Sequence, residues 1–487
     1  MRSKLKELSK DTVVYGISTI VGRFLGFILI PFYTQVFSTA EVGVYGFIYA
    51  YIAFFNIAFT YGMDAAFMKY SSIAKVMEKR KIFSTPYLLV FSSSFIISTF
   101  ILLFKDSMAS FLDLGGEYSS IIIVYVAGIL FFDAVVQIPF ANLRLERKTL
   151  KFASIKIINI CINLSLNVIF ILVYHYGIEA IFLANFIASF ITFLILLPDL
   201  SRHLILKIDK EVMKKMIKFG IPYLPASLAA MLVQAIDKPI MRYMTDDSTL
   251  GVYQANYKLG IFMMLIVSMF QYAWQPFFLI NAKDENAKEL FSKVLTFFLI
   301  VAGLVWVVLT LFIEDVAHIE FMNGKTLIGH DFLEGLVIVP IILLGYVFHG
   351  MYVNFSAGVY IEEKTKYYPL VTGAGAIVNI VVNILLIPVM GIIGAALATL
   401  AAYMVMAGGL FLVSQKFYKI KYEYSKIVPL MAIIFGTGAL YYYLYFNNAL
   451  NLPYKFFILI GFLLLLILLR VVRFDELKKV GRALIRR

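Results

Sequence analysis

The chain consists of long apolar runs that alternate with short polar loops. Hydrophobic residues make up 61% of its 487 residues and charged residues only 15%, whereas soluble domains are about half apolar and one quarter charged. A soluble core cannot bury this much apolar surface. At about 20 residues per span the composition fills roughly fourteen membrane spans, so we expect an all-α polytopic membrane protein. The runs lie near residues 12–37, 42–66, 83–104, 119–141, 153–174, 178–197, 217–243, 250–278, 294–313, 335–356, 367–389, 391–414, 427–446 and 455–472.

The basic residues are distributed unequally between the two sets of loops. Every second loop and both tails are rich in Lys and Arg, while the other loops carry only Lys105, Lys325 and Lys455. By the positive-inside rule both termini are predicted to be cytoplasmic. The net charge of +13 is then mostly an orientation signal, and no nucleic-acid partner is expected.

An internal repeat divides the chain. The motif Glu41–Tyr45 at the start of the second run recurs as Leu250–Tyr253 at the start of the eighth, and Glu146–Thr149 recurs as Glu362–Thr365. Asn163 and Asn167 likewise match Asn379 and Asn383. The repeat unit contains an even number of spans, so both copies have the same orientation, which predicts two parallel six-helix lobes around a central cavity. The expected boundaries are 1–205 and 206–415 for the lobes, with 416–487 forming two additional helices and a basic cytoplasmic tail.

Charged residues inside the apolar runs are the first candidates for function, because each needs a partner, water or a role there. Arg23 and Lys258 lie near mid-membrane depth and Lys238 lies toward the outer end of its span. They are candidates for a cationic cavity that binds an anionic substrate, and structural salt bridges are the alternative. The possible coupling or ion-pair carboxylates are Asp64, Asp133 and Asp237.

Individual charges have different local interpretations. Lys238 and Arg242 lie four residues apart on one helix face, which is repulsive unless an anion is nearby. Near the outer end of its span, Arg242 is expected to snorkel toward lipid phosphates. Asp133, deeper in its span, is the candidate for binding H⁺ or Na⁺.

Polar uncharged residues suggest sugar contacts. Asn163, Asn167, Asn379 and Asn383 are placed to bond sugar hydroxyls, with hydrogen bonds between helices as the alternative. Gln271 and Trp274 offer an amide and an aromatic stacking surface, although Trp274 could equally be packed in the interior.

Motifs for hydrolysis or metal binding are missing. The sequence contains neither G-x-x-x-x-G-K-[ST] nor H-E-x-x-H, and its single cysteine, Cys161, excludes a disulfide framework. We therefore expect no metal, no cofactor and no enzymatic activity.

The N-terminal motifs resemble the polysaccharide transporter family. These are Gly22-Arg23, Pro31–Thr34, Glu41–Tyr45 and Tyr61–Phe67, and Phe270–Phe277 and Asn379–Thr399 are similar to it as well. Members of that family are Wzx-type oligosaccharide flippases of the multidrug/oligosaccharidyl-lipid/polysaccharide exporter superfamily.

The resemblance implies a function in surface polysaccharide or O-antigen (lipopolysaccharide) biosynthesis. A flippase of this type moves undecaprenyl-pyrophosphate-linked oligosaccharides across the bacterial plasma membrane by alternating access. The implied partners are the lipid-linked oligosaccharide, membrane lipids and other polysaccharide assembly proteins, and the working form is expected to be a monomer. Within the superfamily, a lipid II flippase and a cation-coupled drug antiporter remain alternatives. A polytopic glycosyltransferase is a third, disfavoured by the short outer loops.

Overall fold

The computed structural model describes residues 27–72, 78–115, 119–320 and 325–472. In these residues the chain is helical, apart from one isolated bridge between Glu320 and Thr326. Twelve helices are long and apolar enough to cross a membrane, and Phe27–Val36 and Leu452–Leu468 are shorter apolar helices. The expected all-α membrane fold is therefore confirmed. Most of the first expected span lies outside the described residues.

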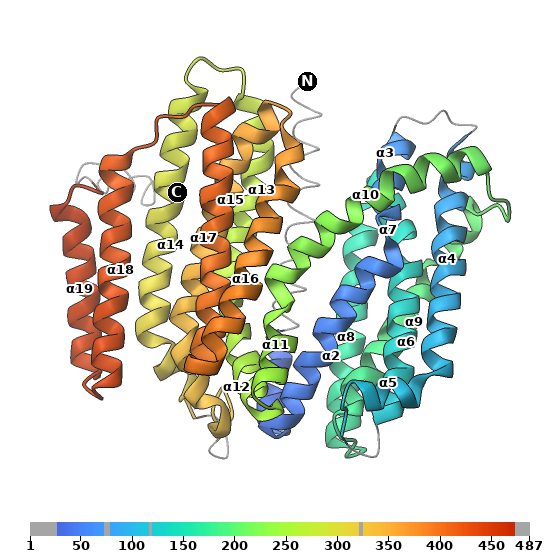
Figure 1. The fold of residues 1–487 in the computed structure, drawn as a ribbon, viewed down its shortest axis with the longest axis horizontal. Coiled ribbons are helices and arrows are strands. Elements are labelled where there is room, and N and C mark those ends of the chain that lie inside the picture. The colour runs from blue at the N-terminus through green and yellow to red at the C-terminus, as the bar shows by residue number, and fades with distance from the viewer. Residues whose placement is uncertain (1–26, 73–77, 116–118, 321–324, 473–487) are drawn as a thin grey trace. The chain divides into compact units, whose positions relative to one another are not determined.

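The chain divides into two compact units (Figure 1). Unit 1 runs to Ala255 and includes Asn379–Gly391, and unit 2 contains Asn256–Val378 and the residues from Ile392 onward. The lobe boundary expected near residue 205 remains a prediction. The helices up to the end of unit 1 are α2 (Thr39–Thr60), α3 (Met63–Ser72), α4 (Lys79–Leu103), α5 (Lys105–Phe111), α6 (Ser119–Val135), α7 (Gln137–Leu145), α8 (Thr149–Leu172), α9 (Glu179–His203), α10 (Lys210–Ala235), α11 (Asp237–Met244) and α12 (Asp247–Tyr257).

The remaining elements begin with a single turn of 3₁₀-helix. They are η2 (Lys258–Gly260), α13 (Ile261–Asn281), α14 (Ala287–Ala317), η4 (His330–Ile338), α15 (Val339–Ile361), η5 (Thr365–Tyr367), α16 (Tyr368–Met390), α17 (Ile392–Phe417), α18 (Tyr424–Phe446) and α19 (Leu452–Leu468). Helix α16 belongs to unit 2 up to Val378 and to unit 1 from Asn379.

Several of the expected spans are interrupted helices, and the fourth breaks at Val136 between α6 and α7. The second ends at Thr60, because Tyr61 and Gly62 adopt φ angles of +31° and +73° before α3 begins. The seventh breaks at Ile236 between α10 and α11, and the eighth contains the η2 turn at Lys258. An apolar run predicts which part of the chain is buried in the membrane, but it does not predict where the helix is interrupted.

Helix α6 is at the centre of the packing in unit 1. It packs against α4, α9 and α2, and α8 packs along α9. Part of the core is a cluster of Val136, Phe140, Leu143, Ile155 and Leu196.

Helix α15 is the most buried span of unit 2. Its most apolar window is 83% buried, and it packs along α17, α13 and α14. The Nε1 of Trp306 in α14 donates a hydrogen bond to the carbonyl oxygen of Pro340 at 2.9 Å. Helices α18 and α19 pack on α14, and the buried Lys455 donates to Asp315 at 2.7 Å.

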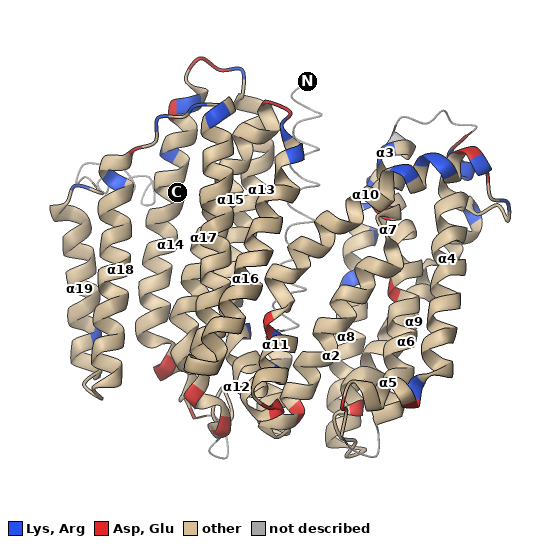
Figure 2. Cartoon of the chain, viewed as in Figure 1, with Lys and Arg blue, Asp and Glu red and all other residues tan. Residues whose placement is uncertain are grey.

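Within each unit, basic and acidic side chains gather at opposite ends (Figure 2). In unit 1 the basic end contains the start of α4 and the first turns of α10, and acidic residues gather near α12. In unit 2 the turn between α13 and α14 lies at the basic end, and acidic residues lie near the other end of α14. This polarity agrees with the alternation of charge along the sequence, and the cytoplasmic location of the termini remains a prediction.

Candidate substrate-binding site

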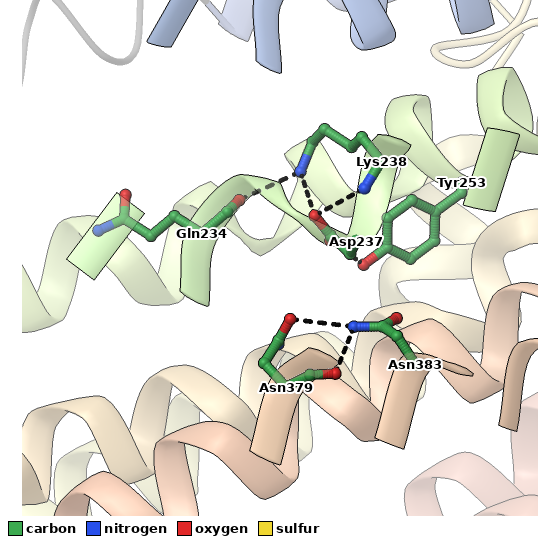
Figure 3. Close-up of polar contacts among 6 residues, drawn as sticks. All are labelled: Gln234, Asp237, Lys238, Tyr253, Asn379 and Asn383. Carbon is green, nitrogen blue, oxygen red and sulfur yellow. Dashed lines mark hydrogen bonds and ion pairs between the residues drawn. The ribbon is translucent and has the colours of Figure 1, made fainter. Parts of the chain in front are cut away.

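A buried ion pair lies at the start of α11, directly after the helix break at Ile236. Lys238 Nζ lies 3.0 Å from Asp237 Oδ1, and their side chains are 8% and 1% exposed. The ammonium also donates to the Gln234 carbonyl oxygen at 3.2 Å. Asp237 Oδ2 accepts a hydrogen bond of 2.6 Å from the Tyr253 hydroxyl (Figure 3).

The local sequence explains this arrangement. Pro239 has no backbone N–H and disfavours a continuous helix through this segment. Asp237 stands in the first turn of α11, where the helix dipole favours an anion, and its Oδ1 also accepts from the Lys238 backbone N–H at 3.0 Å. The carboxylate therefore has three donors. Removing one partner of such a buried pair would leave an uncompensated charge.

Two asparagine pairs have the same geometry in the two sequence repeats. Asn167 Nδ2 donates to the Asn163 carbonyl at 2.8 Å and to its Oδ1 at 3.1 Å. Asn383 Nδ2 makes the same two bonds to Asn379, at 2.8 and 2.9 Å. The matched contacts support the internal repeat.

The two pairs differ in their remaining contacts. The Tyr33 hydroxyl donates to Asn167 Oδ1 at 2.8 Å. The buried Asn379 Nδ2 and Asn383 Oδ1 make no hydrogen bond within the described structure. These two atoms retain capacity for a ligand, in the part of α16 that belongs to unit 1 together with α11 (Figure 3).

Asp133 lies in a polar network of α6, α8 and α9. Its Oδ1 accepts from the Ser189 hydroxyl at 2.7 Å, and Lys156 is close enough to act on it electrostatically. Lys156 also lies over the Phe140 ring at 4.3 Å. Sequence reasoning missed Lys156 as a charge inside a span, although residue 156 falls within the expected run at 153–174.

Arg242 does not snorkel, contrary to the expectation from sequence. It is buried, and its Nε donates to Asp247 Oδ1 at 2.5 Å. Its two terminal nitrogens donate to the carbonyl oxygens of Leu112 and Asp113 at 2.6 and 2.7 Å, and the guanidinium lies 4.2 Å from the centre of the Phe47 ring. The guanidinium makes four hydrogen bonds within the protein, so Arg242 ties α11 to α12, α2 and the loop after α5.

The repeat motifs pack against each other near this arginine. A Cβ added at Gly43 would collide with the Asp247 carbonyl oxygen, and one at Gly251 would collide with that of Thr39. The hydroxyls of Thr39 and Ser248 also contact each other. Helices α2 and α12 therefore cross with their backbones in direct contact, at equivalent positions of the two repeats.

The remaining expected residues lie elsewhere. Lys258 is half-buried at the first position of η2 in unit 2. Gln271 is exposed on α13. Trp274 is buried, its Nε1 donates to the Asn354 carbonyl at 3.2 Å, and its ring contacts Phe270, Phe277, Phe278 and Phe291.

Two further candidate residues are predicted from the sequence, Asp64 and Arg23. Asp64 lies in the first turn of α3, where it complements the helix dipole. Arg23 lies outside the described residues. In the part of the chain that the structure describes, no group of three or more His, Cys, Asp or Glu could hold a metal ion.

A family model described as "Polysaccharide biosynthesis protein" matches residues 8–282, which is more than half of the chain. The chain belongs to this family. No curated protein matches the sequence.

Solved structures similar to this member of the polysaccharide biosynthesis family are transporters and flippases. One is the lipid II flippase MurJ in an inward closed conformation, with 17% identity, a TM-score of 0.73 and coverage of 97% of this chain and 100% of that one. Another is an inward-facing multidrug resistance MATE transporter of the MOP superfamily, with 13% identity, a TM-score of 0.64 and coverage of 81% and 94%. A MOP superfamily transporter from Pyrococcus furiosus has 14% identity, a TM-score of 0.54 and coverage of 85% and 97%. At these identities the likeness shows the fold, and it agrees with the superfamily expected from the sequence motifs.

Proposed function

We propose that the chain is a flippase that moves undecaprenyl-pyrophosphate-linked oligosaccharides across the bacterial plasma membrane by alternating access. Its family is one of polysaccharide biosynthesis, and it shares its fold with a lipid II flippase and with transporters. A sugar-phosphate headgroup is anionic and hydrophilic, so a protein that moves it through the bilayer needs buried cations and hydrogen-bonding groups.

One observation carries the proposal, namely that cations lie at interruptions of membrane helices. Lys238 follows the break between α10 and α11, and Lys258 begins the η2 turn between α12 and α13. Transporters commonly bind substrates at such discontinuous helices, because the break frees backbone groups for a ligand. Together with Arg23, which belongs to the proposal on sequence grounds, these residues would bind the pyrophosphate.

Lys238 is paired in its resting state. Its ammonium is neutralised by Asp237, so the pair carries no net charge. We propose that Lys238 engages the substrate by exchanging the Asp237 carboxylate for a phosphate oxygen. The carboxylate would keep the hydrogen bond from Tyr253 and the one from its neighbouring backbone N–H.

The polar uncharged residues would contact the sugars. Gln271 is exposed, and Asn163 is half-buried. Asn379 and Asn383 have free hydrogen-bonding atoms but are buried, so they would reach a hydroxyl only after the neighbouring helices move apart. Trp274 would likewise need to leave its aromatic cluster.

A cation-coupled antiporter is the second candidate, because MATE transporters share the fold. It would require a buried carboxylate that is available to a proton or Na⁺. Asp133 accepts a hydrogen bond from Ser189 and lies within electrostatic range of Lys156, so its carboxylate already has contacts inside unit 1. We therefore expect the Asp133→Asn variant to keep its transport activity. If this variant instead lost drug efflux, the antiporter would be favoured.

The cellular test is deletion of the protein followed by analysis of lipid-linked intermediates. We expect undecaprenyl-pyrophosphate oligosaccharides to accumulate on the cytoplasmic side and surface polysaccharide to disappear. Accumulation of lipid II instead would indicate a lipid II flippase, and unchanged intermediates would refute both assignments.

Complementation of the deletion tests the cationic site. Lys258→Gln should fail to restore surface polysaccharide, whereas Lys258→Arg, which keeps the charge, should restore it. Lys455→Gln is the matched control for a buried cation outside the proposed site, since Lys455 pairs with Asp315 at the acidic end of unit 2. Full activity of Lys258→Gln in a correctly inserted protein would contradict the role of Lys258.

A further inference from the structure

The first half of α10 differs in direction from the other spans of unit 1. Figure 1 shows it running across the end of the unit, nearly perpendicular to α4 and α6, before the helix turns downward. Pro222 and Pro225 lie inside the helix, where each removes a backbone hydrogen bond and favours a bend. The segment before Pro222 therefore lies along the surface of the helix bundle.

The underside of this segment is fixed to α3 and to the α2–α3 break. Met216 and Gly220 are buried, and a Cβ at Gly220 would lie 2.9 Å from the Tyr61 carbonyl oxygen. The Tyr70 hydroxyl donates to the Lys215 carbonyl at 3.4 Å, and Lys69 Nζ lies 4.1 Å from the centre of the Phe219 ring. These contacts determine which face of the helix points outward.

The start of the segment is also fixed. Asp209 Oδ1 caps α10 by accepting from the backbone N–H groups of Glu211 and Val212, and Lys81 pairs with its Oδ2 at 3.3 Å. The preceding turn is held to α4, because the Ser84 hydroxyl accepts from the Ile205 backbone N–H at 2.7 Å. The segment is therefore a rigid platform with few ways to reorient.

The outward face of the platform is basic. Residues 202–218 contain six basic residues against two carboxylates, Asp209 and Glu211, and Asp209 is already bound to Lys81. Figure 2 shows basic residues along this part of α10. All six are exposed: Arg202 at the end of α9, Lys207 in the turn, and four lysines on α10, which we call the α10 basic face, namely Lys210, Lys214, Lys215 and Lys218.

Apolar side chains are exposed next to these lysines. Leu206, at the tip of the preceding turn, is 84% exposed, and Ile208, Ile221 and Tyr223 are exposed as well. Exposed apolar residues are costly in water, whereas a helix with lysines and apolar side chains lying in the membrane interface is stabilised by both. Basic clusters on such helices attract anionic lipids.

A nearby cavity does not account for the charges. It measures about 430 Å³ and lies between α3, α4 and α10. Its lining contains the carboxylates of Glu78, Asp209 and Glu211 but only two lysines, Lys81 and Lys215, so it is unsuited to an anion. The anion-binding feature is the outward face of the helix.

We infer that the α10 basic face binds the headgroups of anionic phospholipids, with the turn at Leu206 inserted among the lipids. The surface is separate from the proposed substrate site and does not depend on which molecule the protein transports. Since α10 leads directly into the break before Asp237, lipid binding would fix the helix that precedes Lys238.

The test uses the full chain with Leu206→Trp, reconstituted in phosphatidylcholine vesicles. Brominated lipids quench a nearby indole, and the natural Trp274 and Trp306 are buried in unit 2, so their signal is subtracted with the unsubstituted chain. At equal mole fraction, brominated phosphatidylglycerol should quench the new Trp more strongly than brominated phosphatidylcholine. The preference should fall as salt rises.

Substitutions then test which residues cause the preference for phosphatidylglycerol. Each lysine removed should lower the relative association of phosphatidylglycerol by up to about 5-fold, so changing Lys210, Lys214, Lys215 and Lys218 together to Gln should abolish it. The matched control changes four basic residues in unit 2, Lys366, Lys416, Lys419 and Lys421, to Gln and should leave it unchanged.

Three results would overturn the inference. These are equal quenching by both lipids, absence of quenching by either lipid, and an equal loss of preference in the control. If the fourfold variant does not fold, the salt titration of the Leu206→Trp protein alone still decides the question, because a salt-independent preference is incompatible with headgroup binding by lysines.

Discussion

The Asp237–Lys238 pair gives a quantitative prediction, since both side chains are buried and their charged atoms lie 3.0 Å apart. Asp237→Asn removes the carboxylate charge from the buried ammonium of Lys238, which still donates to the Gln234 carbonyl. Breaking a buried pair in this way costs about 3 kcal/mol of unfolding free energy. Lys238→Met leaves the carboxylate with the Tyr253 hydroxyl and a backbone N–H, so we expect a smaller cost of about 2 kcal/mol.

The double variant removes both charges and leaves no uncompensated ion. Its cost should be about 2 kcal/mol, so the double-mutant cycle should give a coupling energy of about 3 kcal/mol. The assay is unfolding of the purified chain in mixed micelles with increasing sodium dodecyl sulfate, followed by circular dichroism.

A surface pair in unit 2 is the matched control for this cycle. Lys293 and Glu289 lie 2.6 Å apart but are 60% and 65% exposed, so solvent screens their attraction and no measurable coupling is expected. Additive effects at Asp237 and Lys238, or a coupling as small as in this control, would refute the assignment of a buried ion pair.

Further variants test other parts of the structure. Gly251→Ala should force α12 away from the Thr39 carbonyl on α2, costing about 1–3 kcal/mol of unfolding free energy in the same assay, and an unchanged stability would contradict the close crossing. Arg242→Lys should be destabilised like Arg242→Gln, because one ammonium cannot reach Asp247 and both loop carbonyls at once. Equal stability of Arg242→Lys and the unsubstituted chain would contradict the role of these guanidinium hydrogen bonds. The backbone N–H of Val212, with further help from Lys81, holds the pKa of Asp209 below its ordinary value. Its capping contribution is therefore present above the ordinary pKa and lost as pH falls through the lowered one. The protection factors of the backbone amides at the start of α10, which correct the exchange rates for their intrinsic pH dependence, should therefore fall on acidification, and an equal fall in Asp209→Asn would show that another group is responsible.

The sequence predicted the spans well, because burial in a membrane requires long apolar runs whatever the packing. The repeat motifs were also informative, since Asn163–Asn167 and Asn379–Asn383 make the same bonds. Helix breaks were harder to predict. At Ile236 the local sequence contains a signal, Pro239, but an apolar run alone does not register it. At Tyr61 the break depends on backbone conformation and on contacts with other helices.

Partners of buried charges were the least predictable feature. Lys238 pairs with its neighbour Asp237, and the carboxylate is completed by Tyr253, a residue of the next helix that carries no charge. Arg242 was expected to reach lipid, yet it binds carbonyl oxygens of the loop after α5, which only the folded chain brings close. The sequence shows which charges lie inside apolar runs and therefore need a partner, but it does not show which residue provides that partner.

The most direct test of the proposed function is a reconstituted flipping assay with the purified chain. An undecaprenyl-pyrophosphate oligosaccharide with a reducible fluorophore on its sugar is placed in both leaflets of vesicles, and dithionite is added outside. Vesicles without protein, and vesicles with Lys258→Gln, should retain the fluorescence of their inner leaflet. Vesicles with the unsubstituted chain or Lys258→Arg should lose nearly all fluorescence. Retention of the inner-leaflet signal by the unsubstituted chain, in vesicles shown to contain folded protein and to be sealed, would contradict the flippase assignment.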